Sequence, residues 1–221
     1  MKKIWKKIIF VWILIFSFGL CFLAYKDATT IATVMIDPGH GGYDVGAISI
    51  DQSTYEKDLT LTIGKQIGYE IKRINPKIKV IYTRTKDDVK WPSDESLDLQ
   101  YRVQMAQKQK ADFYLSIHMN ASENTQAKGY SFHIREDDML AGQIAQNMDE
   151  QFKNIHWSQS RGIVYTSRQP LYVVDHLPHS MLLETGFITN PSELRALNSH
   201  FTQKNIAKAI ARAICDAMIE D

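Results

Sequence analysis

Cysteine is scarce in this 221-residue chain, which contains only Cys21 and Cys215. The two cysteines lie near opposite ends of the chain and provide no disulfide framework, so a hydrophobic core must stabilise the fold. Internal repeats and low-complexity tracts are also missing, and the length fits one ordinary domain. Nor is there an excess of basic charge. The formal net charge is +1, and because residues 1–30 carry five lysines and one aspartate, the rest of the chain is near −3. This balance excludes nucleic acid as a partner.

The first 31 residues differ in kind from the remainder. Lysines cluster in a basic segment, residues 1–7, which precedes an uncharged apolar run over residues 8–24. As a helix this run would span roughly 25 Å, close to the thickness of the hydrocarbon core, and the lysines before it predict a cytoplasmic N-terminus. We expect a transmembrane signal anchor followed by a short linker, residues 25–31. The alternative is a cleaved signal peptide, although the run does not end in a small-x-small site.

Short apolar runs bounded by turn residues indicate buried strands at residues 34–36, 79–83, 113–117 and 180–184. Between them, apolar residues recur every three or four positions, as on one face of an amphipathic helix, over residues 63–74, 140–152 and 206–218. Residues 129–135, 161–167 and 171–174 are expected to be short extended segments. The alternation predicts a single α/β domain over residues 32–221, with a twisted, mostly parallel central sheet flanked by helices.

Three of the expected strands end in a residue suited to metal or acid–base chemistry: His40, His118 and Glu184. The carboxyl ends of parallel strands lie at one edge of the sheet, where open α/β sheets bind ligands. Glu56 lies just before the first expected helix and can lean over the same edge, although a carboxylate at a helix start is often only a solvated group favoured by the dipole. Two imidazoles and one carboxylate with an open fourth position suit catalytic zinc, and the remaining carboxylate would be the general base.

Four blocks of sequence occur in order: DPGHGGYDVGA, YEKDLTL, FYLSIHMNAS and LLETGFITNPSE. Together they resemble the zinc-dependent N-acetylmuramoyl-L-alanine amidases of the amidase type 3 family, over essentially all of the chain from residue 33. The resemblance implies one Zn²⁺ ion held by His40, Glu56 and His118, with Glu184 as the catalytic carboxylate. It also implies peptidoglycan as the substrate and hydrolysis of the amide between N-acetylmuramic acid and L-alanine, which releases stem peptides from the glycan strands.

Two alternatives to this activity are a non-catalytic peptidoglycan-binding module on the same fold and a zinc peptidase that cuts within the stem peptide. The expected location is the cell envelope, with the catalytic domain anchored to the membrane and lying outside the cytoplasm, or secreted if the N-terminal segment is cleaved. The end of the chain at residue 221 suggests no added wall-binding module.

The sequence departs from the family pattern before the catalytic glutamate. Where the family usually has proline, five residues before Glu184, this chain has His179, preceded by Pro178. His176 and His179 therefore form an H-x-x-H pair whose role is open between metal binding, lining of a substrate groove and a plain surface loop. Some members of the family carry a helix that plugs the site. Only about thirty residues separate Tyr130 from Arg161 here, which leaves room for an ordinary helix, so we expect no plug.

Overall fold

The computed structural model describes residues 30–89, 91 and 93–218, together with the isolated residues Trp5, Trp12 and Phe16. Two compact units separate at residue 31, and the second unit comprises Ala32–Asp221. The basic segment 1–7, the apolar run 8–24 and the linker 25–31 lie almost entirely outside the described residues. In the part of the chain that is described, no helix is both long and apolar enough to cross a membrane.

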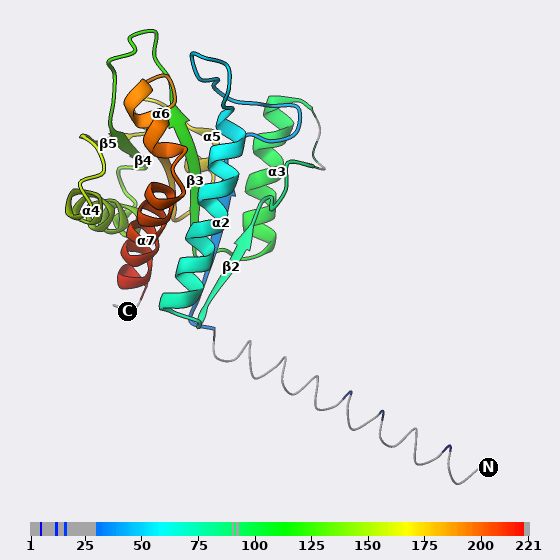
Figure 1. The fold of residues 1–221 in the computed structure, drawn as a ribbon. Helices are drawn as coiled ribbons and strands as arrows, with labels where there is room; N and C mark the ends of the chain where they lie inside the picture. Colours follow the sequence, from blue (N-terminus) through cyan, green and yellow to red (C-terminus); the bar gives the residue numbers. More distant parts are fainter. Residues whose placement is uncertain are drawn as a thin grey trace. The chain divides into compact units, whose positions relative to one another are not determined.

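A six-stranded sheet forms the centre of the second unit, in the order β2-β1-β3-β6-β4-β5 (Figure 1). Neighbouring strands are parallel except β4 and β6, which pair antiparallel. The expected mostly parallel α/β domain is thus confirmed. The strands are β1 (Ala32–Pro38), β2 (Ile78–Tyr82), β3 (Phe113–Asn120), β4 (Tyr130–Ile134), β5 (Ser160–Tyr165) and β6 (Ser180–Phe187).

Helices cover both faces of this sheet, and α2 and α7 lie side by side on one of them (Figure 1). The larger apolar core joins α2, α4 and α7 to alternate residues of the central strands, such as Val34, Ile36 and Leu115. A smaller core joins α3 and α5 to the opposite alternation, which includes Met35, Tyr114 and Leu182. The helices are α2 (Glu56–Ile74), α3 (Glu95–Lys108), α4 (Met139–Asn154), α5 (Tyr172–Asp175), α6 (Pro191–Leu197) and α7 (His200–Ala217).

Helix α5 corrects one expectation, because residues 171–174 are not extended. The chain instead makes a single helical turn, in which the amide of Val174 donates to the Leu171 carbonyl over 3.0 Å. The Asp175 carboxylate accepts a hydrogen bond from the Leu171 amide at 3.0 Å and closes this turn. The apolar residues Val173 and Val174 face the smaller core. Four apolar or β-branched letters do not by themselves distinguish a buried strand from one buried turn of helix.

Candidate metal centre and catalytic site

His40 lies in the turn that follows β1, at the carboxyl edge of the sheet. Its backbone is left-handed, with φ of 62°, a conformation that costs energy in a residue other than glycine. A tight hairpin holds this turn, since Gly41 and Asp44 exchange backbone hydrogen bonds of 2.8 and 3.1 Å. The same hairpin brings the Asp44 carboxylate to 2.7 Å from Nδ1 of His40. This bond fixes the ring orientation and leaves Nε2 to face the other site residues.

His118 projects from β3, and its ring packs against the backbone of Gly39. A Cβ atom built on Gly39 would lie 2.4 Å from both Cε1 and Nε2 of His118, so that position admits only glycine while the ring stays in place. With Nε2 turned toward Gly39, Nδ1 of His118 lies 3.1 Å from Oε1 of Glu56. The rings of His40 and His118 meet edge to face, with centroids 4.8 Å apart.

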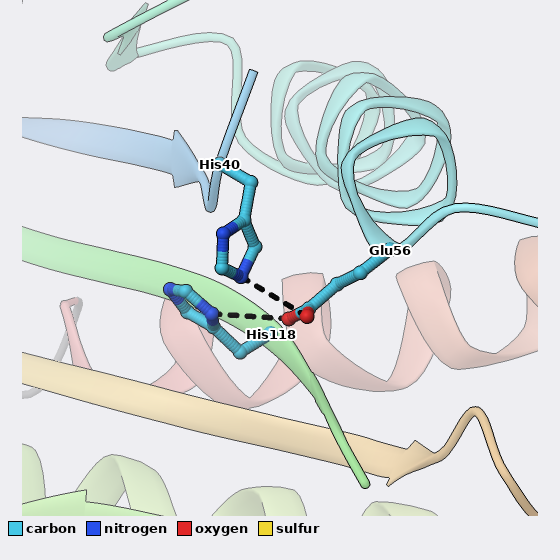
Figure 2. A group of neighbouring side chains, drawn as sticks. All are labelled: His40, Glu56 and His118. Carbon is cyan, nitrogen blue, oxygen red and sulfur yellow. Dashed lines mark hydrogen bonds and ion pairs between the residues drawn. The ribbon is translucent and has the colours of Figure 1, made fainter. Parts of the chain in front are cut away.

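Glu56 is the first residue of α2 and the meeting point of the cluster (Figure 2). Its Oε2 atom lies 3.0 Å from Nε2 of His40. Two backbone amides, those of Ala47 and Met119, each donate to the carboxylate at 2.8 Å. Burial alone would raise the pKa of Glu56, but the hydrogen bonds and charges of His118 and His40 hold it well below its usual range. Glu56 is therefore an ionised and rigidly held carboxylate.

The three side chains together have the donor set of a divalent metal site. One ligand atom from each of His40, Glu56 and His118 can be chosen so that all three lie within 4.8 Å of one another. A Cβ atom on Gly46 would come within 2.6 Å of the His40 ring and 2.7 Å of Oε2 of Glu56, so this glycine keeps the space beside the cluster clear. Against the effect of burial, Glu56 and Asp44 raise the pKa of His40 to about 9. Two imidazoles and one carboxylate fit zinc.

Glu184 lies beside this cluster on β6, directly opposite His118 in the parallel register. Its Oε2 atom is buried and has no hydrogen-bond partner among the described residues. Burial raises the pKa of Glu184 to about 7, an effect that the neighbouring Glu56 reinforces and the two histidines oppose. A carboxyl group with a pKa near neutrality can both take up and release a proton in the working range of an enzyme.

A cleft of about 200 Å³ opens next to the histidines. One wall comes from the first turns of α3, where Glu95 and Asp98 lie, and the other from the α5 region, with Leu171 and Tyr172. His40 and His118 also line the cleft. The cleft therefore makes the cluster accessible from the side of the sheet covered by α3 and α5.

Two buried arginines hold the backbone that leads into His40. The sequence indicated an internal ion pair for Arg102 but not its contact with this backbone, and it indicated no role for Arg84. Arg84 donates to the carbonyl groups of Pro38 and Gly39 at 3.0 and 2.9 Å. Arg102 donates to the carbonyl of His40 at 3.0 Å and pairs with Asp37 at 2.6 Å. The signal was Asp37 itself, since an aspartate that ends a buried apolar run is costly unless it is paired.

The H-x-x-H pair does not join the metal cluster. His176 stacks on Tyr172 with ring centroids 3.9 Å apart, and its Nδ1 atom lies 2.9 Å from the Tyr172 carbonyl. His179 pairs instead with Asp138 at 3.0 Å. Of the open roles, metal binding by the pair is not supported by these contacts, whereas Tyr172 brings the His176 side chain close to the wall of the cleft.

An α/β sheet that presents two histidines and two carboxylates at its carboxyl edge can bind a divalent metal and carry out acid–base chemistry, as a hydrolase requires. The family model described as N-acetylmuramoyl-L-alanine amidase matches residues 34–216. The chain therefore belongs to this family of cell-wall hydrolases, as the four sequence blocks led us to expect.

Named relatives support the same assignment. The chain is 32% identical over 228 residues to N-acetylmuramoyl-L-alanine amidase AmiA of Salmonella typhimurium, covering 82% of this chain and 74% of AmiA. It is 31% identical over 182 residues to the probable cell wall amidase LytH of Staphylococcus aureus, covering 80% of this chain and 55% of LytH. This chain thus spans about half the length of LytH and three quarters of that of AmiA.

Solved structures agree with the fold. The CwlD amidase of Clostridioides difficile, solved in complex with the GerS lipoprotein, matches with a TM-score of 0.78 at 28% identity, over 86% of this chain and 100% of that one. The catalytic domain of the amidase CwlV from Bacillus (Paenibacillus) polymyxa matches with a TM-score of 0.74 at 27% identity, over 86% and 99% of the two chains.

Proposed function

We propose that this chain is a zinc-dependent amidase that hydrolyses the bond between N-acetylmuramic acid and L-alanine in peptidoglycan. In this proposal His40, Glu56 and His118 hold the metal and Glu184 is the catalytic carboxylate. The observation that carries it is the convergence of the three ligand-type side chains beside a buried carboxylate that lacks a partner. The family to which the chain belongs supports the choice of substrate.

The chemistry divides between the metal and Glu184. When bound, Zn²⁺ would supply Lewis acidity, which polarises a carbonyl group and makes water more acidic. Glu184 takes a proton from the attacking water and later gives it to the departing nitrogen of L-alanine, so no net proton is lost over the cycle. Asp44 keeps Nε2 of His40 directed at the cluster, and the amides of Ala47 and Met119 hold the Glu56 carboxylate.

The role of Glu184 is tested with Glu184→Gln in the purified protein. We expect bound zinc to remain, as measured by elemental analysis, while release of stem peptides from purified peptidoglycan falls by at least about 100-fold. Mass spectrometry should show that the wild-type products begin at L-alanine. Glu150→Gln, an exposed glutamate on α4, is the matched control and should behave as wild type. Wild-type activity in Glu184→Gln, or products cut within the stem peptide, would overturn the proposal.

The metal assignment has its own test. His118→Ala removes one ligand and should lower zinc content, whereas His200→Ala, at the first position of α7, should leave it unchanged. A chelator should abolish activity of the wild-type protein and added zinc should restore it, because the ligands survive removal of the ion. Full activity after the zinc is shown to be gone would refute a zinc-dependent reaction.

We further propose that residues 32–221 form the catalytic domain and that residues 8–24 tether it to the outer face of the cytoplasmic membrane. The lysines before the apolar run and its length support this. The linker of about seven residues reaches at most some 25 Å when extended, so the enzyme would act on membrane-proximal wall. The test is fractionation of cells with N-terminal sequencing of the mature protein. Protein in the culture medium that starts after residue 24 would disprove the tether.

A further inference from the structure

Glu184 has polar neighbours on both adjacent strands. On β3 it lies opposite His118, and on β4 it lies directly opposite Ser131. Residues directly opposite each other in paired strands project to the same face of the sheet. His118, Glu184 and Ser131 therefore form a row across that face, yet the proposed reaction assigns no role to Ser131.

Ser131 is in turn bonded to a second unused group, His133. The hydroxyl of Ser131 lies 3.2 Å from Nε2 of His133, two residues along the same strand and on the same face. His133 is only 7% exposed, and its Nδ1 atom has no partner among the described residues. Burial lowers the pKa of His133 and so favours the neutral ring, which carries a single proton.

The position of that proton follows from the unpartnered atom. A buried N–H group without an acceptor is rarer and more costly than a buried lone pair without a donor. We therefore assign the proton to Nε2, which donates to the oxygen of Ser131 and leaves Nδ1 with a bare lone pair. The hydroxyl proton of Ser131 is then free to be donated elsewhere.

In the structure Oε2 of Glu184 is buried and bonds to no described residue, Ser131 included, so it is an open acceptor. Cβ atoms of directly opposed antiparallel residues are about 4.5–5.5 Å apart, within reach of a bond between a serine hydroxyl and a glutamate carboxylate once the longer side chain turns toward it. We propose that Ser131 and His133 are positioning residues for Glu184, in a chain that runs from Nε2–H of His133 to the Ser131 oxygen and from the Ser131 hydroxyl to the Glu184 carboxylate. This inference rests on the proposed role of Glu184.

Such a chain would hold one carboxylate oxygen and leave the other free to receive the proton of the attacking water. No covalent bond changes along it, because each group only donates the proton that it already carries. A hydrogen bond to an ionised carboxylate is shorter and stronger than one between neutral groups. Its loss should therefore affect the orientation of Glu184 during the reaction more than the binding of substrate.

The experiment uses the zinc-loaded protein with a soluble muropeptide substrate. Ser131→Ala should lower kcat about 10- to 100-fold, as substitutions of orienting partners typically do, with KM and zinc content nearly unchanged. Ser160→Ala is the matched control, since this serine lies in the same sheet on β5 and bonds to Asp149 rather than to a site residue. Its kcat should equal that of the wild type. Thermal melting of each variant monitors folding.

A second pair of variants keeps the test decisive even if Ser131→Ala is poorly folded. Glutamine places its amide near the position of Nε2, whereas asparagine places it near Nδ1, so His133→Gln should retain at least about tenfold more kcat than His133→Asn. Wild-type kcat in Ser131→Ala, or equal kcat in the two His133 variants, would overturn this inference alone when Glu184→Gln is inactive. Activity in Glu184→Gln would overturn both this inference and the proposed function.

Discussion

Replacement of Gly39 by alanine isolates one contact on which the site depends. The φ angle of Gly39 is not positive, so the backbone conformation itself should admit alanine and only the added methyl group matters. That methyl would lie 2.4 Å from two atoms of the His118 ring and 2.8 Å from the carbonyl oxygen of Ile117. Carbon atoms in contact are about 3.5–4.0 Å apart, so the ring must retreat by about 1 Å or the turn must move by the same amount.

A shift of 1 Å is large for a metal ligand, whose distance to the ion varies by only about 0.2 Å in a well-formed site. We expect Gly39→Ala to weaken zinc binding and to lower activity by about 100-fold, the loss typical of a misplacement of this size. The assays are a competition titration with a chromophoric zinc chelator and the release of stem peptides from peptidoglycan. The overpacked contact should also cost about 1–3 kcal/mol in the free energy of unfolding.

Gly142→Ala is the control for this prediction. Gly142 is in α4, and the nearest atom to an added Cβ is 3.9 Å away, an ordinary contact. Alanine should therefore stabilise the helix by about 0.5–1 kcal/mol without any change in zinc affinity. If Gly39→Ala binds zinc as tightly as Gly142→Ala does, the packing of His118 on residue 39 does not position the ligand, and the reasoning fails.

Three further predictions concern the groups that support the site. Arg102→Met should lower the free energy of unfolding, measured with urea, by about 3–5 kcal/mol, because Asp37 and Asp98 lose a buried partner. Lys153→Met, which removes the more exposed pair with Asp149, should lower it by less than about 1 kcal/mol. Burial raises the pKa of Asp37, but Arg102 and three hydroxyl donors lower it to about 2 from 3.8. About 2 kcal/mol of stability that is present above pH 4 should therefore be lost as the pH falls toward 2, and Asp37→Asn should abolish this pH-dependent loss. Asp138→Ala should lower the free energy of unfolding by about 1–3 kcal/mol, because the Asp138 carboxylate caps α4 and accepts a hydrogen bond from the amide of Ser180. His179→Ala removes a half-exposed partner of the same carboxylate and should cost far less, and equal losses in thermal melts would contradict this.

The positions of the candidate site residues followed from the sequence because the ends of buried strands can be recognised in it. An apolar run that stops at a histidine or glutamate places that side chain at the edge of a parallel sheet, and His118 and Glu184 are indeed opposite each other in the register. Glu56 was a candidate for a different reason, because it is an acidic residue just before the first expected helix, and in the structure it is the first residue of α2. Residues of this kind are positioned by the backbone element that carries them, so local pattern suffices.

The contacts that hold these residues in place could not be predicted in the same way. Arg84 and Arg102 act on carbonyl groups of residues 38–40, which are more than forty positions away in the sequence. The antiparallel pairing of β4 with β6, which brings Ser131 opposite Glu184, was likewise not evident, because a strand's apolar pattern does not state its direction. Contacts set by tertiary structure alone leave little trace in one sequence.

The loop before Glu184 is an example of a backbone segment that is restrained by tertiary contacts. A proline at position 179 would limit the backbone by fixing φ, but this chain has histidine there. Here the preceding backbone is held from outside, because Arg135 donates to the carbonyl groups of Leu177 and Pro178. The Asp138 carboxylate accepts a hydrogen bond of 3.0 Å from the amide of Ser180, the first residue of β6. Two charged side chains therefore position the strand that carries Glu184, so the departure at His179 changes how the loop is restrained and leaves the register of Glu184 beside His118 intact.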